Sequence, residues 1–139
     1  MDKAQSIRRL NELYAEEVEA ALRYLHFVVT MRGLDRLTMR DPLLRMLDET
    51  LAHARVVAEK VLQMGGVPQL DLKVHLPAEK VTGPAAMSEA LSFEQAALDG
   101  YRELLEDSRD LPEVAEFARE QVALESRHVA ELELLVEDD

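Results

Sequence analysis

The chain contains no cysteine and no tryptophan, and several other residue types are scarce. Its 139 residues include three phenylalanines, three tyrosines, five glycines and five prolines. The lack of cysteine excludes disulfides, thiolate metal sites and cysteine nucleophiles, and it favours a reducing compartment. Alanine, leucine, glutamate and arginine are abundant instead, and these residues lose little rotamer freedom in a helix. This composition favours a helical bundle.

The sequence also lacks long apolar runs and an excess of basic residues. No apolar run approaches the roughly 18 residues of a membrane-spanning helix, and the opening MDKAQSIRRL has no apolar stretch of the signal-peptide type. The formal net charge is −12, whereas nucleic acids and anionic membranes bind clustered lysine and arginine. We therefore expect a soluble, cytoplasmic protein without nucleic-acid or membrane partners, folded as one domain over residues 1–139.

Four segments carry apolar residues at helical spacing, at about residues 3–31, 41–64, 84–107 and 110–136. Gly33 is expected to end the first helix. Asp41 and Pro42 are expected to begin the second, because an acidic cap and a proline in the first turn are typical of helix N-termini. Asp110 and Glu113 resemble a capping box at the start of the fourth helix.

The segment between the second and third helices is unusually long for a loop. It covers residues 65–83, is mostly polar and contains two prolines. A loop of this length fits a compact domain if it crosses the whole bundle and joins two parallel helices. The other connections are short and join antiparallel neighbours. The sequence thus predicts an all-α, up-down-down-up four-helix bundle with one long crossover between helices 2 and 3.

Ionisable residues lie on the apolar stripe about midway along every predicted helix. They are Glu17, His53, Glu94, and the pair Glu125 and His128. In an up-down bundle these positions lie at one level and converge. Burying three carboxylates together requires protonation or a cation among them. Because glutamate and histidine suit iron, manganese and zinc, we expect a site for two divalent metal ions.

Each of these residues taken alone has a simpler interpretation. A single glutamate such as Glu17 or Glu94 is more often ion-paired or extended towards solvent. His53 alone is more often a hydrogen-bonded core histidine. Tyr24 and Tyr101 are expected to pack in the core, with hydroxyls that need a partner. Only the coincidence on four helices favours the metal site.

The chain resembles the ferritin-like di-iron carboxylate proteins, most closely the bacterioferritins. The resemblance is carried by LNELYAEEVEAALRYL, HARVVAEKVLQMGGVPQL, LSFEQAALDGYRELL and LESRHVAELELL. In this family two helices each supply a glutamate and two supply Glu-x-x-His. The resemblance implies Glu17 and Glu94 as terminal ligands, His53 and His128 as one ligand per metal, and Glu125 as a bridge. It also implies two irons per chain, with manganese or zinc as alternatives, and Fe(II) oxidation by O2 in iron storage or detoxification.

Two positions depart from the bacterioferritin pattern. The bridging glutamate of the second helix is replaced by Thr50, and Glu49 stands beside it. Glu49 is a sixth ligand if it reaches the metals, for instance through a local π-bulge; otherwise the site has three carboxylates and holds one or two ions. Leu51 occupies the position of the haem-binding methionine, so no haem is expected. Tyr24 lies near the site and is a candidate catalytic residue that donates an electron or a hydrogen bond.

Other functions stay open on the sequence alone. A non-catalytic metal-binding protein, or a structural helical bundle, would have lost the bridging carboxylate at Thr50. A peroxidase resembling rubrerythrin and a manganese-dependent relative are variants of the oxidase hypothesis. Because the sequence ends just after the fourth predicted helix, we expect a homo-oligomer. A dimer or a differently assembled oligomer is expected at least as much as the cage that bacterioferritins form.

Overall fold

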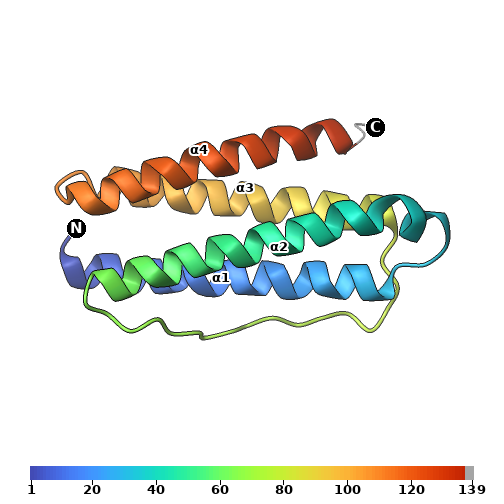
Figure 1. The fold of residues 1–139 in the computed structure, drawn as a ribbon, viewed down its shortest axis with the longest axis horizontal. Helices are drawn as coiled ribbons and strands as arrows, with labels where there is room; N and C mark the ends of the chain where they lie inside the picture. The colour runs from blue at the N-terminus through green and yellow to red at the C-terminus, as the bar shows by residue number, and fades with distance from the viewer. Residues whose placement is uncertain (137–139) are drawn as a thin grey trace.

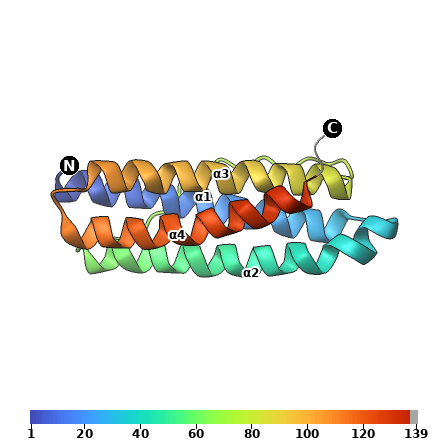
Figure 2. The same cartoon turned by 90° about the horizontal axis from the view of Figure 1, so that it is seen from above.

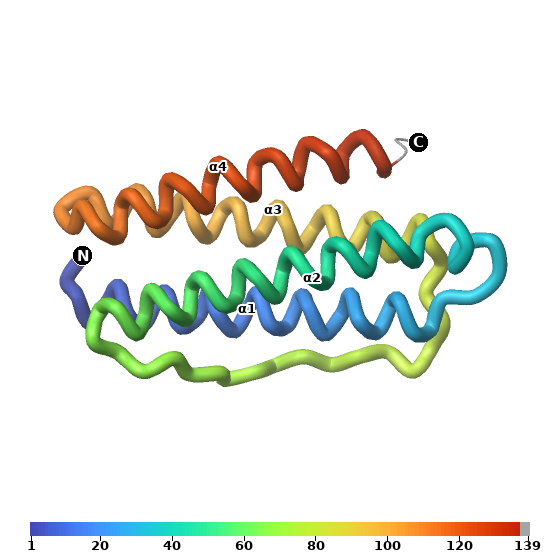
Figure 3. The backbone as a smooth tube through the Cα atoms, viewed as in Figure 1, coloured from blue at the N-terminus to red at the C-terminus, as the bar shows by residue number. Residues whose placement is uncertain are grey.

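The computed structural model describes residues 1–136, which form four α-helices in an elongated bundle (Figure 1). The helices are α1 (Lys3–Thr30), α2 (Gly33–Gln63), α3 (Gly83–Asp107) and α4 (Pro112–Leu135). Helix α1 pairs with α2 and α3 pairs with α4, each antiparallel. Helices α2 and α3 run in the same direction, because residues 64–82 return along the length of the bundle (Figure 3). The predicted up-down-down-up fold is confirmed; the last three residues of the predicted domain, 137–139, lie outside the described part.

The prediction that the second helix begins at Asp41 is wrong. Helix α2 begins at Gly33, whose φ of +69° is a backbone conformation that favours glycine. Pro42 lies inside the helix, where it has no N–H to donate and crowds the carbonyl of the preceding turn. Figure 2 shows the first turns of α2 set at an angle to the rest of the helix, as proline commonly causes.

Tertiary contacts stabilise these additional turns of α2. Arg36 Nη1 donates to the carbonyl oxygens of Val28 and Met31, at 3.0 and 3.2 Å, and so satisfies acceptors at the end of α1. Asp35 Oδ2 accepts a hydrogen bond from the backbone N–H of Gly83 at 2.9 Å. The start of α2 is therefore joined both to the end of α1 and to the start of α3.

The predicted capping box at the start of the fourth helix is also wrong. The residue that precedes α4 is Leu111, and no side chain among the described residues caps the helix there. Pro112 occupies the first turn, where a missing N–H costs nothing. The Asp110 carboxylate instead lies 3.5 Å from the amino terminus at Met1. Asp110 therefore joins the α3–α4 turn to the beginning of the chain.

Polar side chains of α1 hold the long crossover in place. They lie about two turns apart on one face and bond to the crossover backbone: Asn11 to Gln69 N at 2.9 Å, Glu19 to Lys73 N at 2.7 Å, and His26 to Pro77 O at 2.7 Å. The loop is extended and has few internal hydrogen bonds, so these contacts satisfy its backbone groups.

Two apolar clusters fill the bundle and leave a polar layer between them. One cluster contains Leu10, Leu13, Val57, Val61, Tyr101, Leu104 and Val114, among others. The other contains Tyr24, Phe27, Val28, Leu43, Ala86, Ala90 and Leu132, among others. Each helix passes from one cluster to the other through a mid-helix position that is polar. None of the helices over residues 1–136 is both long enough and apolar enough to cross a bilayer.

Candidate metal centre

The polar layer brings all the predicted ligand-bearing helices together. Glu17, Glu94 and Glu125 are 5, 6 and 0% exposed, from α1, α3 and α4. His53 from α2 and His128 from α4 are partly buried beside them. Buried apolar residues of the same helices, such as Leu13, Val57, Leu98 and Val129, place these helix faces inward, and the glutamate or histidine follows that face into the interior.

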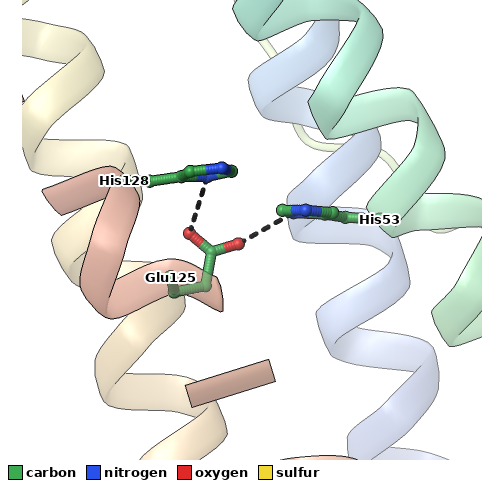
Figure 4. A group of neighbouring side chains, drawn as sticks. All are labelled: His53, Glu125 and His128. Carbon is green, nitrogen blue, oxygen red and sulfur yellow. Dashed lines mark hydrogen bonds and ion pairs between the residues drawn. The ribbon is translucent and has the colours of Figure 1, made fainter. Parts of the chain in front are cut away.

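Glu125 lies beside both imidazoles and contacts each of them, as Figure 4 shows. Its Oε1 is 3.0 Å from His53 Nδ1, and its Oε2 is 3.9 Å from His128 Nδ1. The two rings are nearly parallel, with centroids 5.2 Å apart and planes inclined by 10°. One donor atom from each of these three residues lies within 4.8 Å of the others. Each carboxylate oxygen thus faces a different imidazole, the arrangement of a carboxylate that bridges two cations.

Two tyrosines bind the outer carboxyls in a crossed pattern. Tyr24 of α1 donates its hydroxyl hydrogen to Glu94 of α3 at 2.9 Å, and Tyr101 of α3 donates to Glu17 of α1 at 3.0 Å. Each tyrosine follows a glutamate of its own helix by seven residues, two turns along the same face. The sequence predicts Tyr24 near the site and Tyr101 only as part of the core, although the repeated Glu-x6-Tyr spacing marks both.

Helix α2 contributes a threonine at the buried position and a glutamate at the rim. Thr50 is 3% exposed, whereas the Glu49 side chain is 53% exposed and has its Oε2 3.3 Å from His128 Nε2. The helix is α-helical throughout Gly33–Gln63, with no π-bulge in that range. Glu49 therefore approaches the centre from outside.

Burial determines the protonation of this layer. Desolvation, followed by the neighbouring Glu94 carboxylate, raises the pKa of Glu17 from 4.5 to about 8. Desolvation and the adjacent Glu125 raise the pKa of Glu94 to about 8, and desolvation raises that of Glu125 to about 7. Burial lowers the pKa of His53. Without a cation, the layer therefore favours neutral carboxyls and a neutral imidazole.

The donor set fits divalent cations. Within residues 1–136, no lysine or arginine forms an ion pair with Glu17, Glu94 or Glu125. The buried Oε2 of Glu125 has no hydrogen-bonding partner among these residues, and neither has the Oε1 of Gln121, one turn earlier on α4. Oxygen and imidazole donors suit iron, manganese and zinc. A cation among them would replace the missing counter-charge.

The layer is reached by cavities on opposite sides of the bundle. One lies between α1 and α3 and is lined by Glu16, Glu17 and Glu94, among others. The other is lined by residues of α2, α3 and α4, including Glu49 and His128. Small ions therefore have short routes from solvent to the buried carboxyls.

A model of the ferritin-like domain family matches residues 7–139. The chain belongs to the ferritin-like family. A ferritin-like, diiron-carboxylate protein from Bacillus anthracis str. Ames has a similar structure, with a TM-score of 0.84 and 27% identity over 99% of this chain and 100% of that one. Among curated proteins, none matches this ferritin-like chain.

Two more distant structures share the ferritin-like fold. A Dps protein from Bacillus brevis has a TM-score of 0.85 at 18% identity, over 99% of this chain and 100% of that one. A dodecameric thioferritin, the bacterioferritin-related protein from Bacteroides fragilis, has a TM-score of 0.82 at 20% identity, over 96% and 84%. At these identities the likeness shows the fold alone.

Proposed function

We propose that this ferritin-like protein binds iron in its buried polar layer and oxidises Fe(II) with O2 at a modified di-iron centre. The position of Glu125, with one oxygen towards each imidazole at 3.0 and 3.9 Å, is the observation that carries the proposal. The similar protein from Bacillus anthracis is itself described as a diiron-carboxylate protein, which supports two ions in this chain.

The residues of the layer take distinct roles in this proposal. His53 and His128 would each hold one ion, Glu125 would be shared by the two, and Glu17 and Glu94 would each hold one ion. Bound iron would supply the electrons that reduce O2. The carboxyls release their protons when Fe(II) enters, and the flanking apolar clusters limit the access of water. Tyr24 and Tyr101 orient the outer carboxylates through their hydroxyls.

Anaerobic titration of the metal-free protein with Fe(II), followed by exposure to O2, tests this function. We expect two Fe(II) per chain and ferric absorbance in the near ultraviolet that rises faster than in buffer. In Glu125→Gln the ferric absorbance should rise no faster than in buffer, because an amide cannot bridge two cations as a carboxylate does. Glu120→Gln, an exposed change on the same helix, is the matched control and should behave as wild type. Oxidation no faster than in buffer would reject the oxidase function.

A second function is favoured by Thr50. Its place in the buried layer leaves the centre with three buried carboxyls, while Glu49 stays at the rim. In that case the protein binds metal ions without oxidising them. The same titration distinguishes the two functions, because saturation with Fe(II) would then be followed by no O2-dependent absorbance change.

We also propose that the protein forms a homo-oligomer. Leu25 and Val29 of α1 and Leu51 of α2 are 45, 62 and 48% exposed, which leaves large apolar side chains on these helices open to a partner. The related Bacteroides fragilis protein is described as dodecameric. Light scattering coupled to size-exclusion chromatography should give a multiple of the 15.7 kDa chain mass. The mass of a single chain would contradict this.

A further inference from the structure

The two ring nitrogens of His128 face different carboxylates. Nδ1 points into the layer, 3.9 Å from Glu125 Oε2 and 4.0 Å from Glu94 Oε2. Nε2 points outward, 3.3 Å from Glu49 Oε2. A neutral imidazole has one nitrogen that carries hydrogen and one with a free lone pair. Which nitrogen faces the buried carboxylates therefore decides which one is available to a metal ion.

We propose that Glu49 is a positioning residue for His128, not a bridging metal ligand. Its carboxylate oxygen, 3.3 Å from Nε2, favours the tautomer that carries the hydrogen on that nitrogen, which leaves the Nδ1 lone pair directed at the buried layer. A carboxylate behind a metal-binding histidine fixes the tautomer and the ring orientation and makes the ligand nitrogen more basic. This role rests on the metal centre proposed above. It concerns Glu49, which on the sequence alone is a ligand only if it reaches the metals.

The position of Glu49 argues against a bridge. A bridging carboxylate would need an oxygen near each of the two imidazoles, as Glu125 has, but Glu49 is 53% exposed and contacts the outward side of one ring. The inward-facing position of the same turn belongs to Thr50, which is 3% exposed. Because α2 stays α-helical here, no local change in pitch turns Glu49 inward. The donor atoms that lie within 4.8 Å of one another come from His53, Glu125 and His128, not from Glu49.

The arrangement is asymmetric between the two histidines. Among residues 1–136, Glu125 is the one carboxylate within 4.0 Å of a His53 ring nitrogen, and it faces the layer. His128 has the additional carboxylate behind its ring. The effect of changing Glu49 should therefore appear mainly at His128 and at the ion that it binds.

The test uses the full-length protein, metal-free and loaded with Zn(II), with 15N-labelled histidine. We expect long-range 15N–1H correlation spectra to show a hydrogen on Nε2 of His128 and, in the loaded form, Zn(II) on Nδ1. Glu49→Ala should weaken Zn(II) binding about 10–100-fold without changing the number of ions per chain. Glu49→Gln keeps an acceptor oxygen and should restore part of the affinity. Asp48→Ala, at the exposed neighbouring position, is the matched control.

Several results would overturn the inference. Zn(II) bound through Nε2 of His128 would show that the ring is oriented differently. The loss of one ion per chain in Glu49→Ala would show that Glu49 is a metal ligand. If Glu49→Ala and Asp48→Ala bind Zn(II) equally well, Glu49 does not position His128. If the wild-type protein binds no Zn(II), there is no bound ion towards which His128 could be oriented. Slow Fe(II) oxidation together with the expected spectra and affinities would instead reject the oxidase function and keep the role of Glu49.

Discussion

Replacing Glu17 with glutamine should affect the metal-free and the metal-loaded protein in opposite directions. The Glu17 carboxyl is 5% exposed and accepts a hydrogen bond from Tyr101, which a glutamine amide oxygen can also accept. Glutamine therefore keeps the shape and the hydrogen bond and removes only the ability to ionise. The metal-free protein should become more stable at neutral and alkaline pH, and the metal-loaded protein should lose a ligand.

The magnitude follows from the pKa of Glu17, which rises from 4.5 to about 8, chiefly through burial. A carboxyl whose pKa is raised on folding stabilises the protein below pH 4.5, and this contribution is lost as the pH increases towards 8. Each pH unit in that window corresponds to about 1.4 kcal/mol. Glu17→Gln should therefore raise the unfolding free energy of the metal-free protein by about 1 kcal/mol at pH 5 and by about 3–6 kcal/mol at pH 8.

Urea unfolding at pH 5, 6.5 and 8, after removal of metals with a chelator, measures this difference. Glu120→Gln, at an exposed position, should change the stability by less than about 0.5 kcal/mol at every pH. With Zn(II) added, the wild-type protein should gain more stability than Glu17→Gln, because bound metal stabilises the folded state more as its affinity rises. A destabilised metal-free variant at pH 8, or a difference independent of pH, would refute the account of the buried carboxyl.

Four further substitutions test the layer and the packing of the helices. Tyr101→Phe removes the donor to a buried carboxyl oxygen and should lower the unfolding free energy in urea by about 1–3 kcal/mol; Tyr24→Phe should act in the same direction, and unchanged stability in both would contradict the crossed hydrogen bonds. Thr50→Glu adds a fourth buried carboxyl, so we expect a lower melting temperature without metal. On adding Zn(II), the melting temperature of this variant should increase more than that of the wild type. The same increase in both proteins would show that the new carboxyl does not reach the ions. Gly83→Ala places a methyl group against Met39, whose sulfur occupies that space, and should cost about 1–3 kcal/mol in thermal unfolding; wild-type stability would show that Met39 moves aside freely.

The sequence is sufficient to predict the order of the helices and the residues of the polar layer. Helical periodicity determines which residues share a face, and position along a helix determines the level at which they meet its neighbours. These two quantities alone place Glu17 and Glu94 at one level of the bundle. The same reasoning could have identified Tyr101, which follows Glu94 by the spacing that separates Tyr24 from Glu17.

The limits of the second and fourth helices could not be derived in this way. Asp41 and Pro42 form a typical helix start, yet α2 begins at Gly33 because Arg36 and Asp35 bond to the ends of α1 and α3. Local signals report what a segment prefers by itself, and hydrogen bonds to the neighbouring helices outweigh them.

Periodicity and helix length are enough to predict the bundle, its crossover, and the glutamates and histidines of the polar layer. The pairing of these groups across the bundle is known from the packed structure: Glu125 contacts both imidazoles, and Glu49 lies behind the ring of His128. The contacts of Glu125 with His53 and of Glu49 with His128 join different helices at 3.0 and 3.3 Å, and such distances are fixed by packing and have no counterpart in the spacing along the chain. The contact of Glu125 with His128 lies within α4 and follows from their three-residue spacing.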